Sequence, residues 1–299
     1  MAHMRTGPGR LALAAAAWMT LQPVTMAQRA PARKAPSRTA PAPSTTRMLV
    51  LLGGVPRPRA MWEAVSAHAG GPEARALLLP WASSDPEGTL AIMRKELEGI
   101  RPPEFLEMAA PGPLDEAAKQ KVLGQIARAR ALIFTSGDQN KLLDVAQDPE
   151  IKAAILARYE AGVVVEANDA GSIAMGELAV TGDEDPTIVD GEQVGTRPGL
   201  GLLPGVVVDT QFVRRQRYNR MLGLLLKYPD RFVIGVGSGT ALVLRNGCEG
   251  EIIGGVNAGT AIVIAMRTTQ AVTAGKPGRV ELVVARPGNK FDCAFIGGR

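Results

Sequence analysis

The 299-residue sequence contains only two histidines, His3 and His68, and only 4% aromatic residues. His3 lies in the N-terminal segment, so His68 alone is left as a histidine base for the rest of the chain. His68 follows a predicted helix and precedes Gly70-Gly71, where a basic side chain favours the helix C-terminus. The scarcity therefore restricts histidine chemistry to one residue, for which a surface or capping role is predicted.

Cysteines are equally scarce, with only Cys248 and Cys293 present. In an exported protein these two could pair, and burial as separate thiols is an equal alternative. The acidic run Asp183-Glu184-Asp185 could attract a cation, but three acids ahead of Pro186 are more typical of a loop. We expect no metal and no other cofactor.

The sequence also lacks a basic face, although its net charge is +5. Residues 1–46 hold six basic residues and no acidic ones, and the remaining 253 residues carry 28 basic against 29 acidic side chains. A nucleic-acid partner is therefore not expected for the folded part.

No apolar run is long enough to cross a bilayer. The longest, Leu11–Leu21, has eleven residues, follows Arg5 and Arg10, and precedes the small-x-small sequence Thr25-Met26-Ala27. This pattern predicts a signal peptide over residues 1–27 and hence an exported protein, periplasmic or extracellular, with no membrane contact after cleavage. Residues 28–46 are rich in Ala, Pro and Arg and predict a disordered linker. A single folded domain is expected over 47–299.

Within that domain, short apolar runs alternate with amphipathic stretches up to about Val180. The predicted strands are Met48–Leu52, Ala76–Leu79, Glu104–Met108, Ala131–Phe134 and Val163–Val165. The predicted helices are Ala60–His68, Pro86–Ile100, Asp115–Arg130 and one or two over Leu142–Tyr159. This alternation predicts an α/β fold with a mostly parallel sheet flanked by helices. Gly and Pro punctuate the short β runs that follow, which predicts added, largely antiparallel C-terminal strands around a helix at Arg214–Lys227.

The stretch Tyr159–Met175 predicts a strand, a sharp turn at Asn168-Asp169 and a helix beginning near Ala170. Strand, tight turn and helix form the geometry of a nucleophile elbow, which exposes one side chain at its tip. The tip here carries Asp169.

Several ordered motifs resemble the cyanophycinase and peptidase E family of serine exopeptidases. They are FTSGDQ at Phe134–Gln139, ANDAGS at Ala167–Ser172, GLGLLPG at Gly199–Gly205, DTQF at Asp209–Phe212, R-x-R-x-x-R at Arg215–Arg220 and GVG…TA at Gly235–Ala241. The resemblance covers roughly residues 47–266. It implies a class I glutamine-amidotransferase-like fold and serine-type hydrolysis of β-aspartyl-arginine peptides.

The catalytic positions depart from the family pattern. Asp169 stands at the position of the family's serine nucleophile, and Gln211 at the position of its histidine base. The family's acidic pair is reduced to Ser238-Gly239. A serine hydroxyl needs a base to take its proton, and glutamine has no titratable nitrogen near neutral pH.

Three interpretations of the elbow stay open. Asp169 could cap the helix by accepting from the N–H groups of Gly171 and Ser172, or it could act as an aspartate nucleophile. Ser172 is a third candidate, although it lies off the tip.

The resemblance further implies substrate binding by Gly137, Asp138 and Gln139, for which an ordinary strand-to-helix turn is the alternative. Arg215 and Arg217 could bind an aspartyl carboxylate. A solvated helix face, with Arg217 and Arg220 spaced i, i+3, is the alternative.

These observations lead to a hypothesis with two rivals. We expect a catalytically degenerate member of the family that binds a peptide or cyanophycin-like ligand. The rivals are an active hydrolase with a non-standard nucleophile, and a structural or interaction protein.

Overall fold

A computed structural model describes residues 46–182, 185, 187–247, 249–254 and 262–291. The predicted signal peptide, almost all of the predicted linker, Asp183, Glu184, Cys248 and Cys293 lie outside the described residues. The described residues belong to one compact unit, Ala40–Arg299. Among them, no helix is both long and apolar enough to span a membrane.

Sheet A has eight strands in the order β14-β11-β10-β1-β5-β4-β2-β3. The five strands from β1 to β3 in that order run parallel, and β10, β11 and β14 extend the sheet antiparallel. Their bounds are β1 Met48–Leu52, β2 Ala76–Leu79, β3 Leu106–Met108, β4 Ala131–Phe134, β5 Val164–Asn168, β10 Thr240–Arg245, β11 Glu249–Gly254 and β14 Lys290–Phe291.

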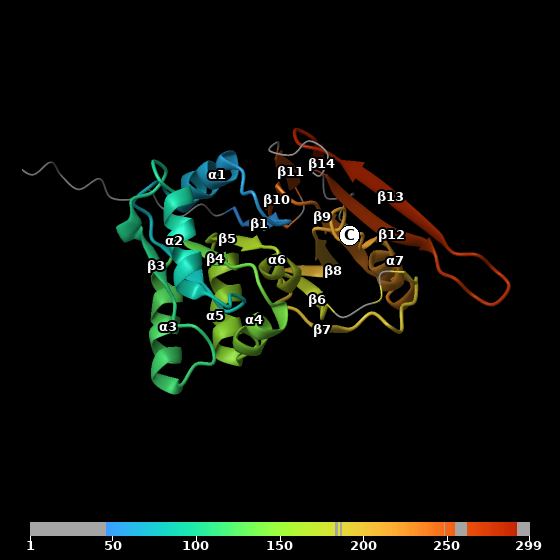
Figure 1. Cartoon of the computed structure of the whole chain (residues 1–299), viewed down its shortest axis with the longest axis horizontal. Coiled ribbons are helices and arrows are strands. Elements are labelled where there is room, and N and C mark those ends of the chain that lie inside the picture. The colour runs from blue at the N-terminus through green and yellow to red at the C-terminus, as the bar shows by residue number, and fades with distance from the viewer. Residues whose placement is uncertain (1–45, 183–184, 186, 248, 255–261, 292–299) are drawn as a thin grey trace, which may run out of the picture. The chain divides into compact units, whose positions relative to one another are not determined.

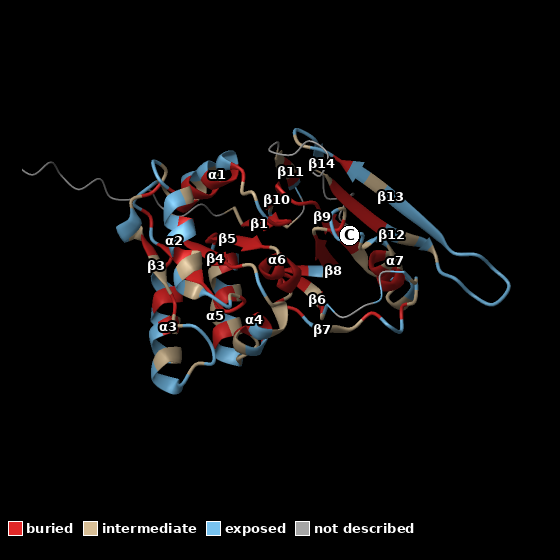
Figure 2. Cartoon of the chain, viewed as in Figure 1, coloured by how far each residue is buried: buried red, intermediate tan, exposed pale blue. Residues whose placement is uncertain are grey.

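Helices cover both faces of sheet A (Figure 1). One face packs against α1 and α2, and the other against α3, α4, α5 and α6. The helices are α1 Arg59–Ala69, α2 Pro86–Glu96, α3 Glu116–Arg128, α4 Gln139–Ala146, α5 Pro149–Glu160, α6 Ala170–Ala174 and α7 Tyr218–Lys227, with a 3-10 turn at Pro103–Phe105. Figure 2 shows the central strands β1, β4 and β5 of sheet A as buried between these layers, as the continuous apolar runs predict.

Sheet B has six strands in the order β13-β12-β9-β8-β6-β7. Their bounds are β6 Gly176–Val180, β7 Thr196–Pro198, β8 Leu203–Thr210, β9 Phe232–Val236, β12 Val263–Gln270 and β13 Arg279–Ala285. The pairs β6–β7, β9–β12 and β12–β13 are antiparallel. The pairs β6–β8 and β8–β9 are parallel, which the sequence pattern did not predict.

The α/β fold with a mostly parallel, helix-flanked sheet and antiparallel additions is thus confirmed. The stretch predicted as one or two helices forms two, because Pro149 begins α5 and Asp148 caps it. The helix predicted over Pro86–Ile100 ends earlier, at Glu96.

Aspartate begins four of the helices. Asp85, Asp115, Asp138 and Asp148 each accept a hydrogen bond from a backbone N–H in the first turn that follows, which satisfies one of the free donors at a helix start. Asp169 occupies the same position ahead of α6 and makes no such bond. The Asp169 carboxylate is therefore free to contact residues other than the helix it precedes.

Candidate functional site

Asp169 is the single residue between β5 and α6, and it forms a sharp turn. Its φ of 52° and ψ of −105° are strained for a residue with a β-carbon. Its N–H donates to the Leu52 carbonyl at 2.8 Å, which fixes the turn to the end of β1. The strand, turn and helix are therefore present as predicted, with an acidic side chain at the tip.

The predicted helix cap is wrong. The Asp169 carboxylate makes no hydrogen bond to the N–H groups of α6. Its Oδ1 instead accepts from the Thr210 hydroxyl at 2.7 Å. Because Thr210 is the last residue of β8 in sheet B, the carboxylate joins the ends of two strands that belong to different sheets.

Asp209, one residue before Thr210, is fully buried and paired. It accepts from Arg220 Nε at 2.9 Å and from Arg220 Nη2 at 2.5 Å. Arg217 Nη1 lies 3.6 Å from Asp209 Oδ1 and donates to the Thr210 carbonyl at 3.1 Å. The arginines therefore brace the turn that carries Thr210.

The interpretation of Arg217 and Arg220 as a solvated helix face is wrong. The helix α7 begins only at Tyr218, and the Arg220 side chain is 3% exposed. Burial and the charge of Arg220 lower the pKa of Arg217, while Asp209 and Asp169 oppose this shift. Arg215 differs, because its side chain is exposed and pairs with no described residue.

Gln211 follows Thr210 with a φ of 52°, so it too is held in a strained turn. Its N–H donates to the Val236 carbonyl at 3.0 Å. A β-carbon placed at Gly54 would lie 3.3 Å from Gln211 Cγ, so the glutamine side chain rests against this glycine. The Gly54 carbonyl in turn accepts from the Gly239 N–H at 2.9 Å.

These contacts gather the positions that the family resemblance singles out. Asp169 is tied to Leu52 at the end of β1, and Gln211 lies against Gly54 two residues further on. Gly239, from the shortened acidic segment, closes on the same loop. The nucleophile, base and acid positions thus lie around one loop, and this chain has Asp, Gln and Ser-Gly there.

Gly137, Asp138 and Gln139 form the loop between β4 and α4. Gly137 has a φ of 137°, and a β-carbon there would lie 1.9 Å from the Ala82 carbonyl oxygen, so only glycine fits. The Asp138 carboxylate caps α4 through the Asn140 N–H at 2.8 Å. Gln139 Nε2 donates to the carbonyls of Val180 and Thr181. Both polar side chains are engaged within the fold.

Ser172 is fully buried, and its hydroxyl contacts the carbonyl oxygens of Leu52 at 2.9 Å and Ala167 at 2.6 Å. Such a hydroxyl is a structural donor and is not presented at the elbow tip. Asp185 accepts from the N–H and hydroxyl of Thr187, as in a turn. The described part of the chain contains no cluster of three potential metal ligands.

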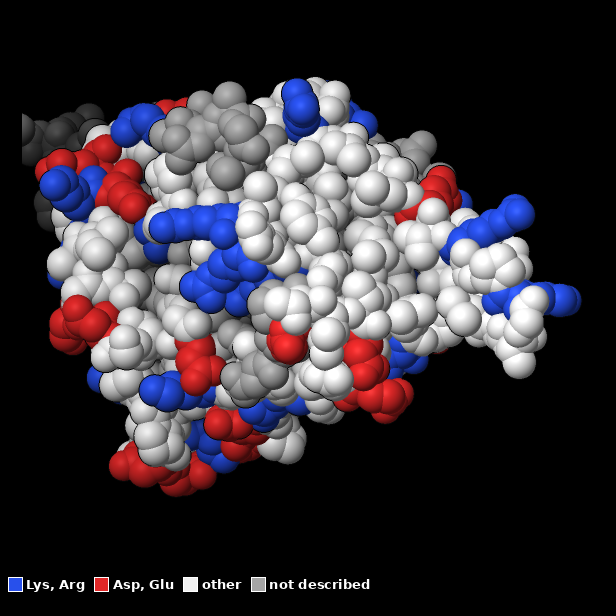
Figure 3. All heavy atoms as spheres, turned by 45° about the vertical axis from the view of Figure 1, so that its right-hand side comes forward, with Lys and Arg blue, Asp and Glu red and all other residues white. Residues whose placement is uncertain are grey.

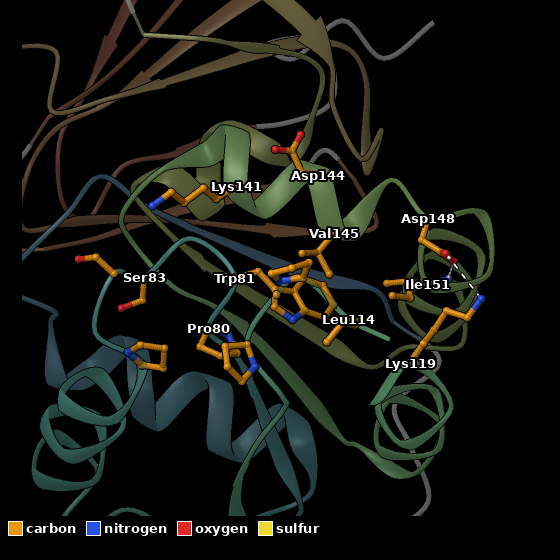
Figure 4. Close-up of a pocket in the computed structure, with 15 residues that line it drawn as sticks. Pro80, Trp81, Ser83, Leu114, Lys119, Lys141, Asp144, Val145, Asp148 and Ile151 are labelled. Carbon is orange, nitrogen blue, oxygen red and sulfur yellow. Dashed lines mark hydrogen bonds and ion pairs between the residues drawn. The ribbon is translucent and has the colours of Figure 1, made fainter. Parts of the chain in front are cut away.

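A groove of about 790 Å³ lies at the carboxyl ends of β2 and β3 and along α4 (Figure 4). Trp81, Leu114 and several prolines form its apolar wall, and Ser83 and Lys141 border it. Ser83 follows Ala82, whose carbonyl packs against Gly137. Figure 3 shows Lys and Arg side chains gathered near the middle of one face, with acidic side chains around them.

Two polar residues at the site have no counterpart in the sequence predictions. Thr210 is the hydrogen-bond donor to Asp169, and its contact joins residues 41 positions apart. Glu166 is fully buried in β5, three residues before the elbow tip. The sequence did contain a signal for the burial of Glu166. The strand that begins in the β-branched run Val163–Val165 must continue to the turn at Asn168, so Glu166 has to lie within it.

Comparison with known proteins decides the family. The sequence profile described as Peptidase family S51 matches residues 49–253, more than half of the chain. The chain belongs to Peptidase family S51. This membership supports a peptidase-like function.

Two relatives from this comparison are named cyanophycinase. The protein from Geminocystis herdmanii is 28% identical over 194 residues, which cover 62% of this chain and 68% of the relative. The protein from Trichormus variabilis is 26% identical over 190 residues, covering 62% of this chain and 63% of the relative. The chain therefore spans about two thirds of the length of these relatives.

A solved structure supports the fold independently. The crystal structure of a peptidase from an acI-B1 Actinobacterium superimposes with a TM-score of 0.59 at 16% sequence identity. The superposition covers 82% of this chain and 96% of that structure. The two chains share a fold.

Proposed function

We propose that this chain is a peptidase-family protein that binds peptides without hydrolysing them. One observation carries the proposal. The carboxylate of Asp169 stands at the elbow tip and accepts from the Thr210 hydroxyl, while Gln211 stands where the family places its base.

Hydrolysis by this family needs a hydroxyl nucleophile and a base that removes its proton. Among the hydroxyls near the elbow, Ser172 and Thr210 are fully buried and already bonded. Gln211 cannot accept a proton near neutral pH. An aspartate nucleophile would still require a base to activate water in the second step. Of the carboxyl groups near the elbow, Asp209 is held by Arg220 and Glu166 is fully buried.

The charge of the site favours a cationic ligand group. Asp169 brings a carboxylate to the place where the family would hold a scissile carbonyl. An arginine guanidinium or free amine of a peptide would complement it. The exposed Arg215 could bind a carboxylate of such a ligand, and the groove along α4 has an apolar wall for the rest of a peptide. A β-aspartyl-arginine dipeptide has both charges. Nucleic acid is not expected to bind, because basic and acidic side chains are nearly equal in number over residues 47–299.

Purified protein is expected to leave such dipeptides and cyanophycin intact, and a serine-directed phosphonate should label no residue. Mass spectrometry measures both results.

Calorimetry with the dipeptide should show saturable binding that Asp169→Asn weakens by up to about tenfold, or about 1.4 kcal/mol. Glu63→Gln, which changes an exposed carboxylate on α1 that does not line the groove, is the control and should leave the affinity unchanged.

The two rival functions predict different results. Release of free dipeptide from cyanophycin, or stoichiometric labelling of a serine, would establish an active hydrolase and overturn the proposal. Absence of any binding would indicate a structural or interaction protein. Unchanged affinity in Asp169→Asn would remove Asp169 from the ligand site.

We further propose that the protein is exported, on the basis of Leu11–Leu21 and Thr25-Met26-Ala27. Mature protein from the native host should begin near Gln28 and appear outside the cytoplasm, and no membrane contact is expected after cleavage. N-terminal sequencing of the fractionated protein measures this. An intact cytoplasmic chain beginning at Met1 would contradict it.

A further inference from the structure

The layer between sheet A and helices α1 and α2 contains buried polar side chains. Side chains alternate between the two faces of a strand, so Glu166 and Asn168 share the face of β5 that Val164 presents to this layer. Glu166 is 0% exposed and Asn168 is 1% exposed. Two adjacent polar side chains thus lie within an apolar cluster that includes Met61 and Trp62.

None of their polar atoms has a hydrogen-bond partner among the described residues. This holds for both carboxyl oxygens of Glu166 and for Oδ1 and Nδ2 of Asn168. Trp62 Nε1 and Arg57 Nε, in the same layer, are likewise buried and unpartnered. Buried polar groups are almost always hydrogen-bonded, and ordered water is the usual partner where protein supplies none.

One cation faces this layer from the loop between β1 and α1. Arg57 is 6% exposed, and its Nη1 donates to both carboxyl oxygens of Glu96 in α2, at 2.9 and 3.1 Å. Burial raises the pKa of Glu166 to about 8, with Arg57 opposing the shift and Glu96 adding to it. The other buried cation of the layer, Arg101, donates instead to the Pro72 carbonyl.

We infer that Glu166 and Asn168 form an internal hydration site in which Glu166 is protonated at neutral pH, and that Arg57 turns from Glu96 toward Glu166 when the proton leaves. A neutral carboxyl has one donor and spare acceptors, and Asn168 has two donors and an acceptor, which suits bound water. An ionised carboxylate in the same apolar layer needs a positive charge, and the unpartnered Nε of Arg57 provides a donor for it.

The site is placed to influence the elbow without contacting a ligand. Asn168 directly precedes Asp169, and Arg57 lies three residues beyond Gly54, against which Gln211 rests. The inference does not depend on the proposed peptide ligand, since it rests on burial and hydrogen bonding alone. Its tests therefore measure stability, titration and bound water.

The free energy of unfolding should fall as pH rises between about 4.5 and about 8. In that interval the unfolded chain has released the Glu166 proton while the folded chain retains it. Each pH unit then lowers the folding equilibrium constant by up to tenfold. Glu166→Gln should remove this contribution and be more stable than wild type at pH 9. Glu63→Gln, an exposed glutamate on α1, should keep the wild-type slope.

The inference is overturned if Glu166→Gln is less stable than wild type at pH 9 with an unchanged slope. A second measurement does not need the variant to fold. Carbon NMR of wild-type protein labelled at the glutamate carboxyls should show one carboxyl titrating near pH 8. Titration of every glutamate near the ordinary value of about 4.3 would also overturn it.

Two further results test the water and Arg57. A crystal structure of wild type near neutral pH should show ordered water bonded to Glu166 and Asn168. The absence of water bonded to either side chain would refute the hydration site. Arg57→Met should move the carboxyl titration to higher pH, because Arg57 opposes the shift. An unmoved titration would refute the role of Arg57.

Discussion

Replacing Arg220 with methionine is expected to lower the free energy of unfolding by about 3–5 kcal/mol. The substitution leaves the fully buried Asp209 with only two polar neighbours among the described residues, the Thr210 N–H at 2.7 Å and Arg217 Nη1 at 3.6 Å. A buried carboxylate that loses its main partner keeps the full cost of desolvation. Chemical denaturation measures the loss.

The double variant Asp209→Leu/Arg220→Met separates the pair from the packing of its side chains. Replacing both charges with apolar groups removes the unpaired charge, so the double variant should be more stable than Arg220→Met alone. Arg59→Met is the surface control, because Arg59 and Glu63 are 60% and 57% exposed and their pair should contribute about 0–1 kcal/mol. A double variant less stable than Arg220→Met would show that Asp209 does not become a costly unpaired charge when Arg220 is lost.

Local patterns were enough to predict the first two thirds of the fold. Strands such as Met48–Leu52 and Ala131–Phe134 are continuous apolar runs, and the helices between them begin at aspartates that cap them. Sheet B was harder to predict because its order depends on pairings between distant segments. The parallel pairing of β8 with β6 and β9 leaves no periodic signal in the sequence.

At the candidate site, the sequence predicted positions better than contacts. Asp169, Gln211 and the Gly137 loop occur where the motifs place them, because strand, turn and helix are local features. The cap prediction for Asp169 failed because the turn at φ 52° does not direct the carboxylate to α6, and Thr210, 41 residues away, donates to it. The burial of Arg220 was likewise invisible, since its partner Asp209 lies on another element.

The part of strand β5 from Glu166 onward was also not predicted from the sequence. The strand was predicted over the β-branched run Val163–Val165, yet β5 continues to Asn168 with Glu166 fully buried. A glutamate is rarely found in so buried a strand. The preference of glutamate for exposed positions reflects its usual ionised form. A buried carboxyl that keeps its proton is uncharged and departs from that preference. The elbow requires a strand that reaches its tip, and this requirement outweighs the local preference.

If the proposed absence of hydrolysis results from the residues at positions 169 and 211, the double variant Asp169→Ser/Gln211→His should react with a serine-directed phosphonate. Serine at the elbow supplies the hydroxyl, and histidine at position 211 supplies the base. The side chain at 211 lies against Gly54, whose lack of a β-carbon leaves room for it. A general base typically contributes about 10²–10⁴-fold. The double variant should therefore be labelled about 10²–10⁴ times faster than Asp169→Ser alone, as measured by intact-protein mass spectrometry.

Gln211→His alone is the matched control for this experiment, because it gains the base and still lacks a hydroxyl at the tip. It should remain unlabelled, like wild type. Equal labelling rates in Asp169→Ser and the double variant would reveal another base near the elbow and would contradict the assignment of position 211. No labelling of a folded double variant would show that Ser238-Gly239, which replaces the acidic pair, is a further barrier, because an imidazole without a carboxylate partner is poorly oriented and weakly basic.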